Sequence, residues 1–272
     1  TSVASTLTGW TSDGFSLGAD NEVNGSGKNY VGWNWKGNGS GSANTDGSIN
    51  STVSASTTSG FSIVKWTGNG STATIGHGLG KVPKMIIVKS LANTTTWMVQ
   101  HTSLGNAKEI YLNGTNAAGN STAWNSTTPT STVFSVTGGA GDGVNASGAY
   151  IAYCFADIQG FSKMGFYDGN GSAEGIFEYL GFKPAFLLIK NTTATEAWFL
   201  YDSKRGYNGS MGALFPDETA ADAFANNIDF LSNGFKLRTG GAILNGNTTR
   251  YIYMAFAESP FVSTNNAAAT AR

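Results

Sequence analysis

The sequence predicts an all-β protein made of tandem antiparallel β-sandwich domains of lectin-like or jelly-roll-like character. Three observations indicate this fold class. One domain-length segment occurs twice in tandem, apolar runs are short and lie between Gly- and Asn-rich turns, and one short stretch alone favours a helix. An incomplete third copy of the segment begins the chain.

The tandem duplication has a constant offset of 101 residues. The matching segments are Gly68–Ser71 with Gly169–Ser172, Met85–Lys89 with Phe186–Lys190, and Tyr150–Phe155 with Tyr251–Phe256. A repeat of this length is a domain rather than a unit of a solenoid. We therefore predict one β-sandwich repeat over residues 59–158 and a second over residues 159–262, each with about seven strands.

The first residues resemble the end of a repeat. Ser12–Leu17 resembles Ser232–Leu237, and Tyr30–Trp35 resembles the two terminal strands. Residues 1–37 are therefore predicted to be the C-terminal half of a β-sandwich repeat, with strands at Gly14–Gly18 and Tyr30–Trp35.

Two segments outside the repeats contain few large apolar side chains. Residues 38–58 are rich in Gly, Ser, Asn and Thr, so we expect a linker that is extended and docked in places. Residues 263–272 are expected to form a flexible tail.

The terminal strand suggests which face of each sheet is the core. Ile151, Tyr153 and Phe155 alternate with Tyr150 and the small residues after it. The matching positions of the other copies also carry large apolar side chains, namely Val31, Trp33, Trp35, Ile252, Met254 and Phe256. We therefore expect this face to point inward, and Phe256→Ala to be destabilising.

The single helix prediction covers Asp217–Asn226. Pro216 precedes it, Asp217 and Glu218 suit the positive end of a helix dipole, and several alanines follow. The stretch is long enough for two to three turns at most.

Composition limits the partners of the protein. Charged residues make up 12% of the chain and its net charge is -1, so no basic face is expected for nucleic acid. The longest apolar runs have about five residues, far fewer than the roughly 20 that span a bilayer, so no membrane insertion is expected. The chain has a single cysteine and thus no internal disulfide.

Few residues have the pattern of a catalytic or metal site. Cys154 corresponds to Asn34 and Ala255 in the other copies, so we interpret it as a small buried strand residue rather than a nucleophile. His77 and His101 have no neighbouring ligand pattern and are interpreted as polar residues at strand ends.

The segment Asp168–Ser172 resembles the start of a calcium loop, but Ala173 and Tyr179 stand where such a loop requires Gly and Glu. No carboxylate pair and no Ser/His/Asp pattern recurs between the repeats. We therefore expect no enzymatic activity, no cofactor and no metal.

Candidates for ligand contact lie where the two repeats differ most, at residues 104–130 and 202–227. Aromatic rings there can stack on the apolar face of a sugar, and charged groups can bind its hydroxyls. The candidates are Trp124, Lys204, Arg205 and Tyr207.

Several phrases resemble a repeat of tailed-phage virion proteins, frequent in marine phages and in tail-fibre or receptor-binding proteins. They are Gly78–Lys89, Ile151–Ala156, Phe161–Lys163, Leu231–Thr239 and the closing Phe256–Phe261. The resemblance covers about Thr11 to Phe261. It implies a non-enzymatic β-sandwich module of a virion appendage, and it assigns no functional residue.

Three functions follow as alternatives. The first is a tail or head fibre module in the virion that contacts a host cell-surface glycan or protein. The second is a capsid decoration protein, and the third is a carbohydrate-binding module of a secreted enzyme. The exposed apolar strands of residues 1–37 also predict contact with other virion proteins or a homo-oligomer, for which the phage-fibre resemblance favours a trimer.

Overall fold

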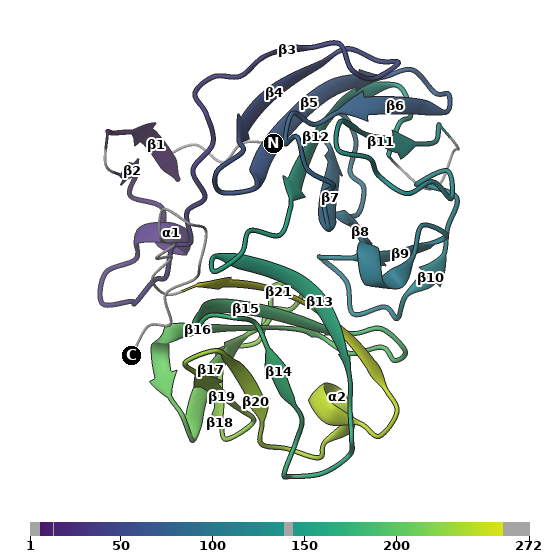
Figure 1. The fold of residues 1–272 in the computed structure, drawn as a ribbon. Helices are drawn as coiled ribbons and strands as arrows, with labels where there is room; N and C mark the ends of the chain where they lie inside the picture. The colour runs from purple at the N-terminus through teal and green to yellow at the C-terminus, as the bar shows by residue number, and fades with distance from the viewer. Residues whose placement is uncertain (1–5, 13, 139–143, 258–272) are drawn as a thin grey trace. The chain divides into compact units, whose positions relative to one another are not determined.

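A computed structural model describes residues 6–12, 14–138 and 144–257 of the chain (Figure 1). The chain divides into two compact units, Thr1–Trp35 and Lys36–Arg272. The fold is all-β, as the sequence predicts, with several antiparallel sheets and only short helical turns. The predicted flexible tail at 263–272 lies outside the described residues.

The smaller unit is a hairpin followed by one helical turn. Strands β1 (Leu7–Trp10) and β2 (Phe15–Leu17) pair antiparallel, and α1 (Asn21–Asn24) follows. The strand predicted at Gly14–Gly18 is thus confirmed. Residues 30–35 are not assigned to a strand, so that prediction is wrong for this unit. Their counterparts in the larger unit form a strand because they have a hydrogen-bonded neighbour on each side.

The first repeat contains an eight-stranded sheet and a two-stranded sheet. In spatial order the large sheet consists of β10 (Gly119–Asn120), β9 (Lys108–Tyr111), β8 (Met98–His101), β7 (Met85–Ser90), β12 (Gly148–Phe155), β5 (Phe61–Gly68), β4 (Ser51–Ser56) and β3 (Ser42–Asn44). The small sheet pairs β11 (Val133–Val136) with β6 (Ala73–Gly76), and a 3-10 turn, η1 (Thr102–Leu104), follows β8.

The stretch predicted as a linker is part of this first sheet. β4 pairs with β5, and β3 pairs with β4 at the sheet edge. Ser54 donates its hydroxyl to Gly39 O at 2.9 Å, which ties the preceding segment down. Side chains this small suit an edge strand whose one face packs on a core that other strands supply.

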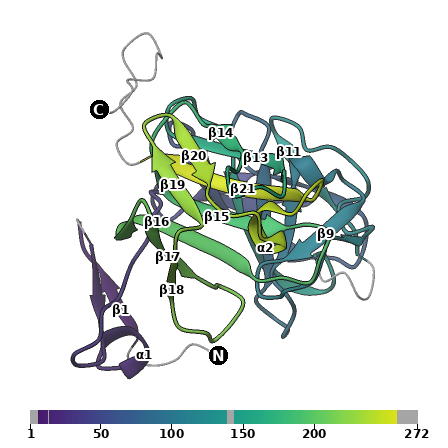
Figure 2. The same cartoon turned by 90° about the horizontal axis from the view of Figure 1, so that it is seen from below.

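The second repeat consists of a six-stranded sheet and a three-stranded sheet that face each other (Figures 1 and 2). The large sheet has the order β13 (Ser162–Asp168), β21 (Arg250–Ala257), β15 (Pro184–Asn191), β16 (Trp198–Tyr207), β17 (Ser210–Leu214) and β18 (Ala223–Ala225). The small sheet has the order β14 (Phe177–Tyr179), β20 (Gly234–Leu237) and β19 (Ile228–Leu231), and α2 (Ala242–Asn245) precedes β21.

Strand order and register repeat as the sequence does. The run β5-β12-β7-β8-β9 of the first repeat corresponds to β13-β21-β15-β16-β17 of the second. The register agrees to the residue in the first three strand pairs of this run; for example, Ser62 pairs with Cys154 and Lys163 pairs with Ala255. It differs in the last pair, β8–β9 against β16–β17. The duplication therefore extends to the hydrogen-bonding pattern of the sheets.

The face that the sequence analysis assigned to the core is the wrong one. The core of the first repeat contains Tyr150, Ala152 and Cys154, on the other face of β12. Large residues share this face, since Trp66 on the neighbouring strand stacks on Tyr150 at 5.3 Å between centroids and meets Phe134 of the small sheet at 5.9 Å. Small strand residues thus make room for large partners, so side-chain size on one strand alone did not identify the core.

The face with Phe155, Ile252 and Phe256 packs between the two repeats. Phe155 and Phe256 contact each other edge to face with centroids 6.0 Å apart. His101 lies 3.2 Å from Tyr253 O, measured from its Nε2. The second face is therefore buried along β21 and half-buried along β12, which explains why both faces of these strands are apolar.

The predicted helix at Asp217–Asn226 does not form. The segment runs irregularly and ends in the edge strand β18. The Asp217 carboxylate accepts a hydrogen bond at 3.0 Å from Trp198 N at the start of β16, instead of capping a helix. A helix of two to three turns is marginal in water, so pairing with β17 prevails.

Candidate functional site

An open, polar pocket of about 430 Å³ lies in the second repeat. Its lining combines a turn before β14, the tip of the β16–β17 hairpin, the start of β19 and the residue after β20. The side chains that define it are Glu174, Asn208, Asp229 and Arg238. We call this the hairpin pocket.

Opposite charges alternate along the wall of the hairpin pocket. The Arg238 guanidinium donates from Nε to Asp229 Oδ2, and its Nη1 lies 3.8 Å from Glu174 Oε2. Lys236 Nζ donates to the same Glu174 oxygen at 3.0 Å. The hydrogen bond from Lys236 and the two positive charges lower the pKa of Glu174. This carboxyl is thus ionised at neutral pH, and two positive and two negative groups balance.

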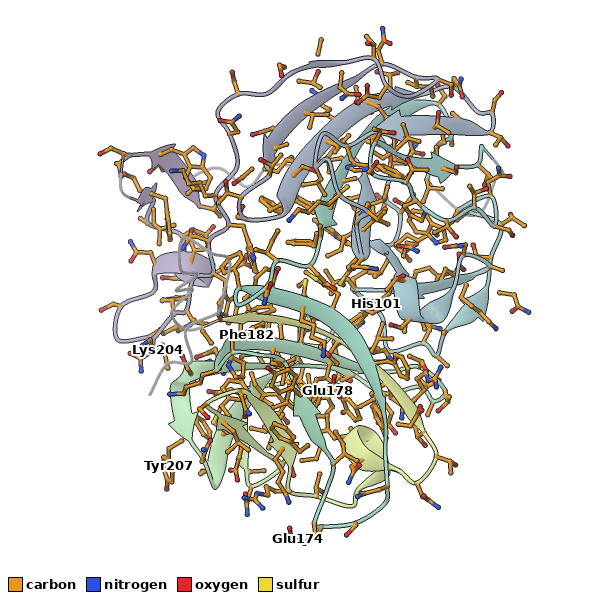
Figure 3. All side chains as sticks on the ribbon, viewed as in Figure 1. His101, Glu174, Glu178, Phe182, Lys204 and Tyr207 are labelled. Carbon is orange, nitrogen blue, oxygen red and sulfur yellow. The ribbon has the colours of Figure 1, made fainter. Side chains whose placement is uncertain are left out.

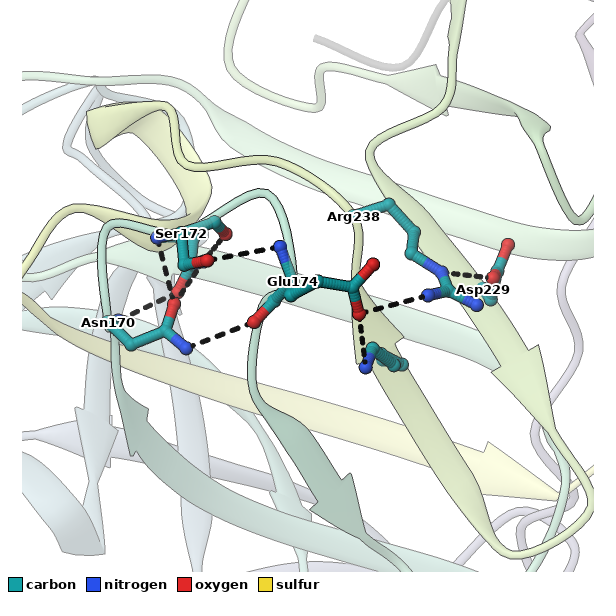
Figure 4. Close-up of polar contacts among 7 residues, drawn as sticks. Asn170, Ser172, Glu174, Asp229 and Arg238 are labelled. Carbon is teal, nitrogen blue, oxygen red and sulfur yellow. Dashed lines mark hydrogen bonds and ion pairs between the residues drawn. The ribbon is translucent and has the colours of Figure 1, made fainter.

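The turn before β14 presents Glu174 to the solvent. The Asn170 carboxamide accepts from Ser172 N at 3.0 Å and donates to Glu174 O, and Ser172 Oγ accepts from Glu174 N at 3.1 Å. These bonds fix the backbone of the turn (Figure 4), while the Glu174 side chain remains 81% exposed.

The hairpin tip is fixed on the other side of the pocket. Asn208 and Gly209 form a two-residue loop between paired Tyr207 and Ser210, and Gly209 has a φ of 98°, a region that favours glycine. The Asn208 carboxamide accepts from Phe230 N at 2.8 Å and donates to Phe230 O at 3.0 Å, as a strand neighbour would. Gly209 N donates to Asp229 Oδ1 at 3.1 Å.

An exposed aromatic ring lies on the same hairpin as one wall of the hairpin pocket. Tyr207 directly precedes Asn208, and its side chain is 73% exposed. Figure 3 shows it projecting away from the repeat. A ring held on a fixed hairpin next to carboxylate and guanidinium groups can stack on one face of a sugar while those groups bind hydroxyls.

The four predicted contact residues divide into two groups. Tyr207 and Lys204 are exposed on β16. Arg205 is half-buried, because its Nε donates to the buried Asp202 carboxylate at 2.7 Å. That carboxylate also accepts from Lys204 N and Arg205 N, so Arg205 stabilises the bend in β16.

Trp124 does not fit a role in ligand contact. Its side chain is 2% exposed and belongs to the core of the first repeat, so no ring face is open to a sugar. The segment 104–130 around it contacts the second repeat, where Thr115 O accepts from Lys190 Nζ at 3.1 Å and from Glu196 N at 2.9 Å. Sequence divergence in this segment therefore reflects packing between repeats.

Sequence reasoning missed Glu174, Asp229 and Arg238, although the signal was present. At the offset of 101 residues the first repeat has neutral residues at the positions of Glu174, Asp229, Lys236 and Arg238, namely Ala73, Thr128, Ser135 and Thr137. In a chain with 12% charged residues, four charges gathered in one copy only are a specific difference between the repeats.

The other chemically suggestive residues have structural environments. Burial raises the pKa of Cys154 to about 12, so its thiol is neutral and enclosed. His77 Nδ1 accepts from Leu79 N at 3.2 Å, and His77 is fully buried. The Asp168 carboxylate is in a bidentate ion pair with Arg250 at 2.9 Å, rather than in a calcium loop. Among the described residues no group of three or more His, Cys, Asp or Glu side chains could hold a metal ion.

Within the part of the chain that the structure describes, no helix is long and apolar enough to cross a membrane. No curated protein and no solved structure matches the chain. One family model, described as a domain of unknown function (DUF7483), matches residues 1–260. Because this match covers nearly the whole chain, the protein belongs to the DUF7483 family.

Proposed function

We propose that this chain is a module of a phage virion fibre, and that its second repeat binds a glycan of the host surface in the hairpin pocket. One observation carries the proposal. Four charged side chains line or adjoin a pocket next to the exposed Tyr207, where the duplicated first repeat has only neutral residues. Duplicated domains that share a core diverge in this way where one copy acquires a binding site.

The charge balance of the pocket favours a neutral, hydroxyl-rich ligand. Arg238 lies between two carboxylates, and Lys236 contacts Glu174, so an anionic group would compete with ion pairs already made. Sugar hydroxyls can donate to the carboxylates and accept from the cations without displacing them. The resemblance to phage fibre repeats supports placing this activity at a host surface.

The experiment is a binding screen of the 1–272 protein on bacterial surface polysaccharides, followed by calorimetry on each hit. We expect Tyr207→Ala and Arg238→Met each to weaken binding by roughly tenfold or more, since each removes about 1–3 kcal/mol of contact. Tyr179→Ala is the matched control, because Tyr179 is 60% exposed on the same repeat but outside the hairpin pocket. Absence of any polysaccharide ligand, or equal loss in all three variants, would refute the proposed site.

The position in a virion is tested separately by labelling particles with an antibody against the chain. Label on fibres supports the fibre module. Label over the capsid surface favours a decoration protein, and protein found only free in the culture medium favours a carbohydrate-binding module of a secreted enzyme.

A further inference from the structure

The smaller unit repeats the closing part of the second repeat in atomic detail. The Tyr30 hydroxyl accepts from Gly25 N at 2.7 Å and donates to Asn21 O at 2.8 Å, across the helical turn α1. In the second repeat the Tyr251 hydroxyl accepts from Gly246 N at 2.8 Å and donates to Ala242 O, across α2. The spacing along the chain is the same in both places, so this is one corner motif.

The similarity includes the asparagine of the corner and the preceding hairpin. Asn24 donates its carboxamide to Gly18 O at 2.9 Å, as Asn245 does to Thr239 O at 2.7 Å. In the hairpins, Trp10 pairs with Phe15 as Phe230 pairs with Phe235. The smaller unit is therefore a half-sandwich with its own side-chain geometry already formed.

The side chains that are core in the complete repeats are exposed in the smaller unit. Tyr30 is 48% exposed, whereas Tyr251 is fully buried. Phe15 and Leu17 are 40% and 38% exposed, whereas their counterparts Phe235 and Leu237 are fully buried. Asn24 is also exposed, whereas Asn145 and Asn245 are fully buried. An apolar face with a polar group at its centre is thus open.

Both complete repeats cover this face with the same element, a strand that ends in a Gly-Asn-Gly-Ser turn. In the second repeat Asn245 Nδ2 donates to Asn170 Oδ1 at 2.8 Å and to Ser172 O at 2.9 Å. In the first repeat Asn145 Nδ2 donates to Asn69 Oδ1 at 3.1 Å and to Ser71 O at 2.7 Å. Two independent copies of the interaction in one chain define what the corner asparagine binds.

An aromatic residue of the same strand covers the corner tyrosine. Tyr167 of β13 stacks on Tyr251 with ring centroids 4.9 Å apart, and Trp66 of β5 stacks on Tyr150 at 5.3 Å. These rings lie just before the Gly-Asn-Gly-Ser turn. Strand, ring and turn therefore form one unit of recognition.

We propose that the unit Thr1–Trp35 is a docking site for a β-strand that carries an aromatic residue and ends in a Gly-Asn-Gly-Ser turn. The occupant is a polypeptide segment of this repeat type other than the three in this chain. Phe61–Ser71 and Ser162–Ser172 are engaged within their own repeats. The third, Gly37–Ser40, is held by Ser54, whose Oγ accepts from Asn38 N at 2.8 Å and donates to Gly39 O at 2.9 Å.

The occupant pairs antiparallel with residues 30–35, and its aromatic ring stacks on Tyr30. Its turn accepts hydrogen bonds from the Asn24 carboxamide.

The side-chain chemistry distinguishes this occupant from a general apolar partner. A second copy of the chain could cover Phe15 and Leu17, but the Gly-Asn-Gly-Ser segment that follows its smaller unit, Gly37–Ser40, is already bound to Ser54. A buried carboxamide without an acceptor is costly, so the face selects a segment that supplies one. Residues 30–35 are not a strand in the smaller unit, and pairing with the incoming strand supplies the backbone hydrogen bonds of a sheet there.

The test uses the full 1–272 chain and a synthetic peptide with the sequence of Ser162–Ser172. Hydrogen exchange detected by mass spectrometry should show slower exchange at residues 29–35 when the peptide is present. A labelled peptide should bind with saturation in fluorescence anisotropy. Replacing the asparagine of its turn by alanine, or making Asn24→Ala in the chain, should each weaken binding by roughly tenfold or more.

Asn50→Ala is the control, since Asn50 is an exposed asparagine outside the smaller unit. This substitution should leave the affinity for the peptide within about twofold of that of the unsubstituted chain. Unchanged exchange at residues 29–35 under saturating peptide would overturn the proposal. So would concentration-dependent dimerisation of the chain that protects residues 29–35 and that the peptide does not reverse, because a second copy would then be the occupant.

Discussion

Phe155 and Phe256 occupy equivalent positions in the two repeats, and their rings contact each other edge to face with centroids 6.0 Å apart. Phe256 also contacts Phe161 and Phe186 at 5.6 and 5.9 Å. The rings of Phe155 and Phe256 lie on the sheet face that points away from the core of their own repeat. The aromatic cluster therefore joins the two repeats and couples their stabilities.

The first prediction concerns this cluster. Phe256→Ala should lower the free energy of unfolding by about 3–5 kcal/mol, because a buried aromatic ring is removed. A double-mutant cycle with Phe155→Ala should give a coupling of about 0.5–1.5 kcal/mol, as for other aromatic pairs. Urea unfolding of the four proteins measures both quantities. Strict additivity would show that the rings do not interact in solution.

The second prediction separates Trp124 from Tyr207. Trp124→Ala should cost about 3–5 kcal/mol of stability, because Trp124 is buried in the first core. Tyr207→Ala should change stability by less than about 0.5 kcal/mol, because its ring is in solvent. Thermal and urea unfolding of both variants check this. Equal stability of the two would contradict the buried position of Trp124.

The fold class and the duplication could be predicted from the sequence because both depend on local patterns. Turn residues such as Gly68–Ser71 and short apolar strands recur at a fixed offset, and the structure repeats them in the same strand order. The core face could not be predicted. Tyr150 and Ala152 alternate with Ile151 and Tyr153, and both sets are apolar because the first is buried in the core and the second is half-buried on the other face.

The candidate site was predicted only in part, for a physical reason. Tyr207 was identified because it lies in a divergent segment with a large exposed ring. Glu174 and Arg238 come from separate turns and strands that only the sandwich topology brings together. Divergence alone also selected Trp124, since a loop that packs against a neighbouring repeat diverges as readily as a loop that binds a ligand.

The third prediction uses the corner asparagine in its two environments. Asn245→Asp replaces a buried donor by an acceptor that faces Asn170 Oδ1 and two carbonyl oxygens. It should lower the free energy of unfolding by about 3 kcal/mol or more, because a buried negative charge then faces three acceptor oxygens and keeps only the hydrogen bond from Asn170 N. Asn24→Asp makes the same change at an exposed position and should cost under about 1 kcal/mol. Similar losses in urea unfolding would indicate that Asn24 is as enclosed as Asn245.

The last prediction is a pH dependence that originates at His101. Its Nδ1 accepts from Ser103 N at 3.2 Å, so its Nε2 carries the proton and donates to Tyr253 O at 3.2 Å. The neutral ring satisfies both neighbours, and burial lowers the pKa of His101 to about 4. A second proton would place a charge in the junction between the repeats and would remove the acceptor for Ser103 N.

The sign of the effect follows from the two pKa values. In the unfolded chain a histidine binds its proton below about pH 6.5, whereas folded His101 does so only near pH 4. The unfolded state therefore binds more protons between these values, and the stabilisation present above pH 6.5 is lost as the pH falls. The loss should reach about 3 kcal/mol near pH 4, at about 1.4 kcal/mol per pH unit.

His101→Gln isolates this contribution, since glutamine keeps a donor for Tyr253 O and does not titrate. Burial also lowers the pKa of His77 and raises those of Asp157 and Asp217, so the wild-type profile contains several contributions. The difference in unfolding free energy between wild type and variant should shrink by about 3 kcal/mol from pH 7 to pH 4. A difference that stays constant over this range would mean that His101 titrates normally, and the junction would then be hydrated rather than closed.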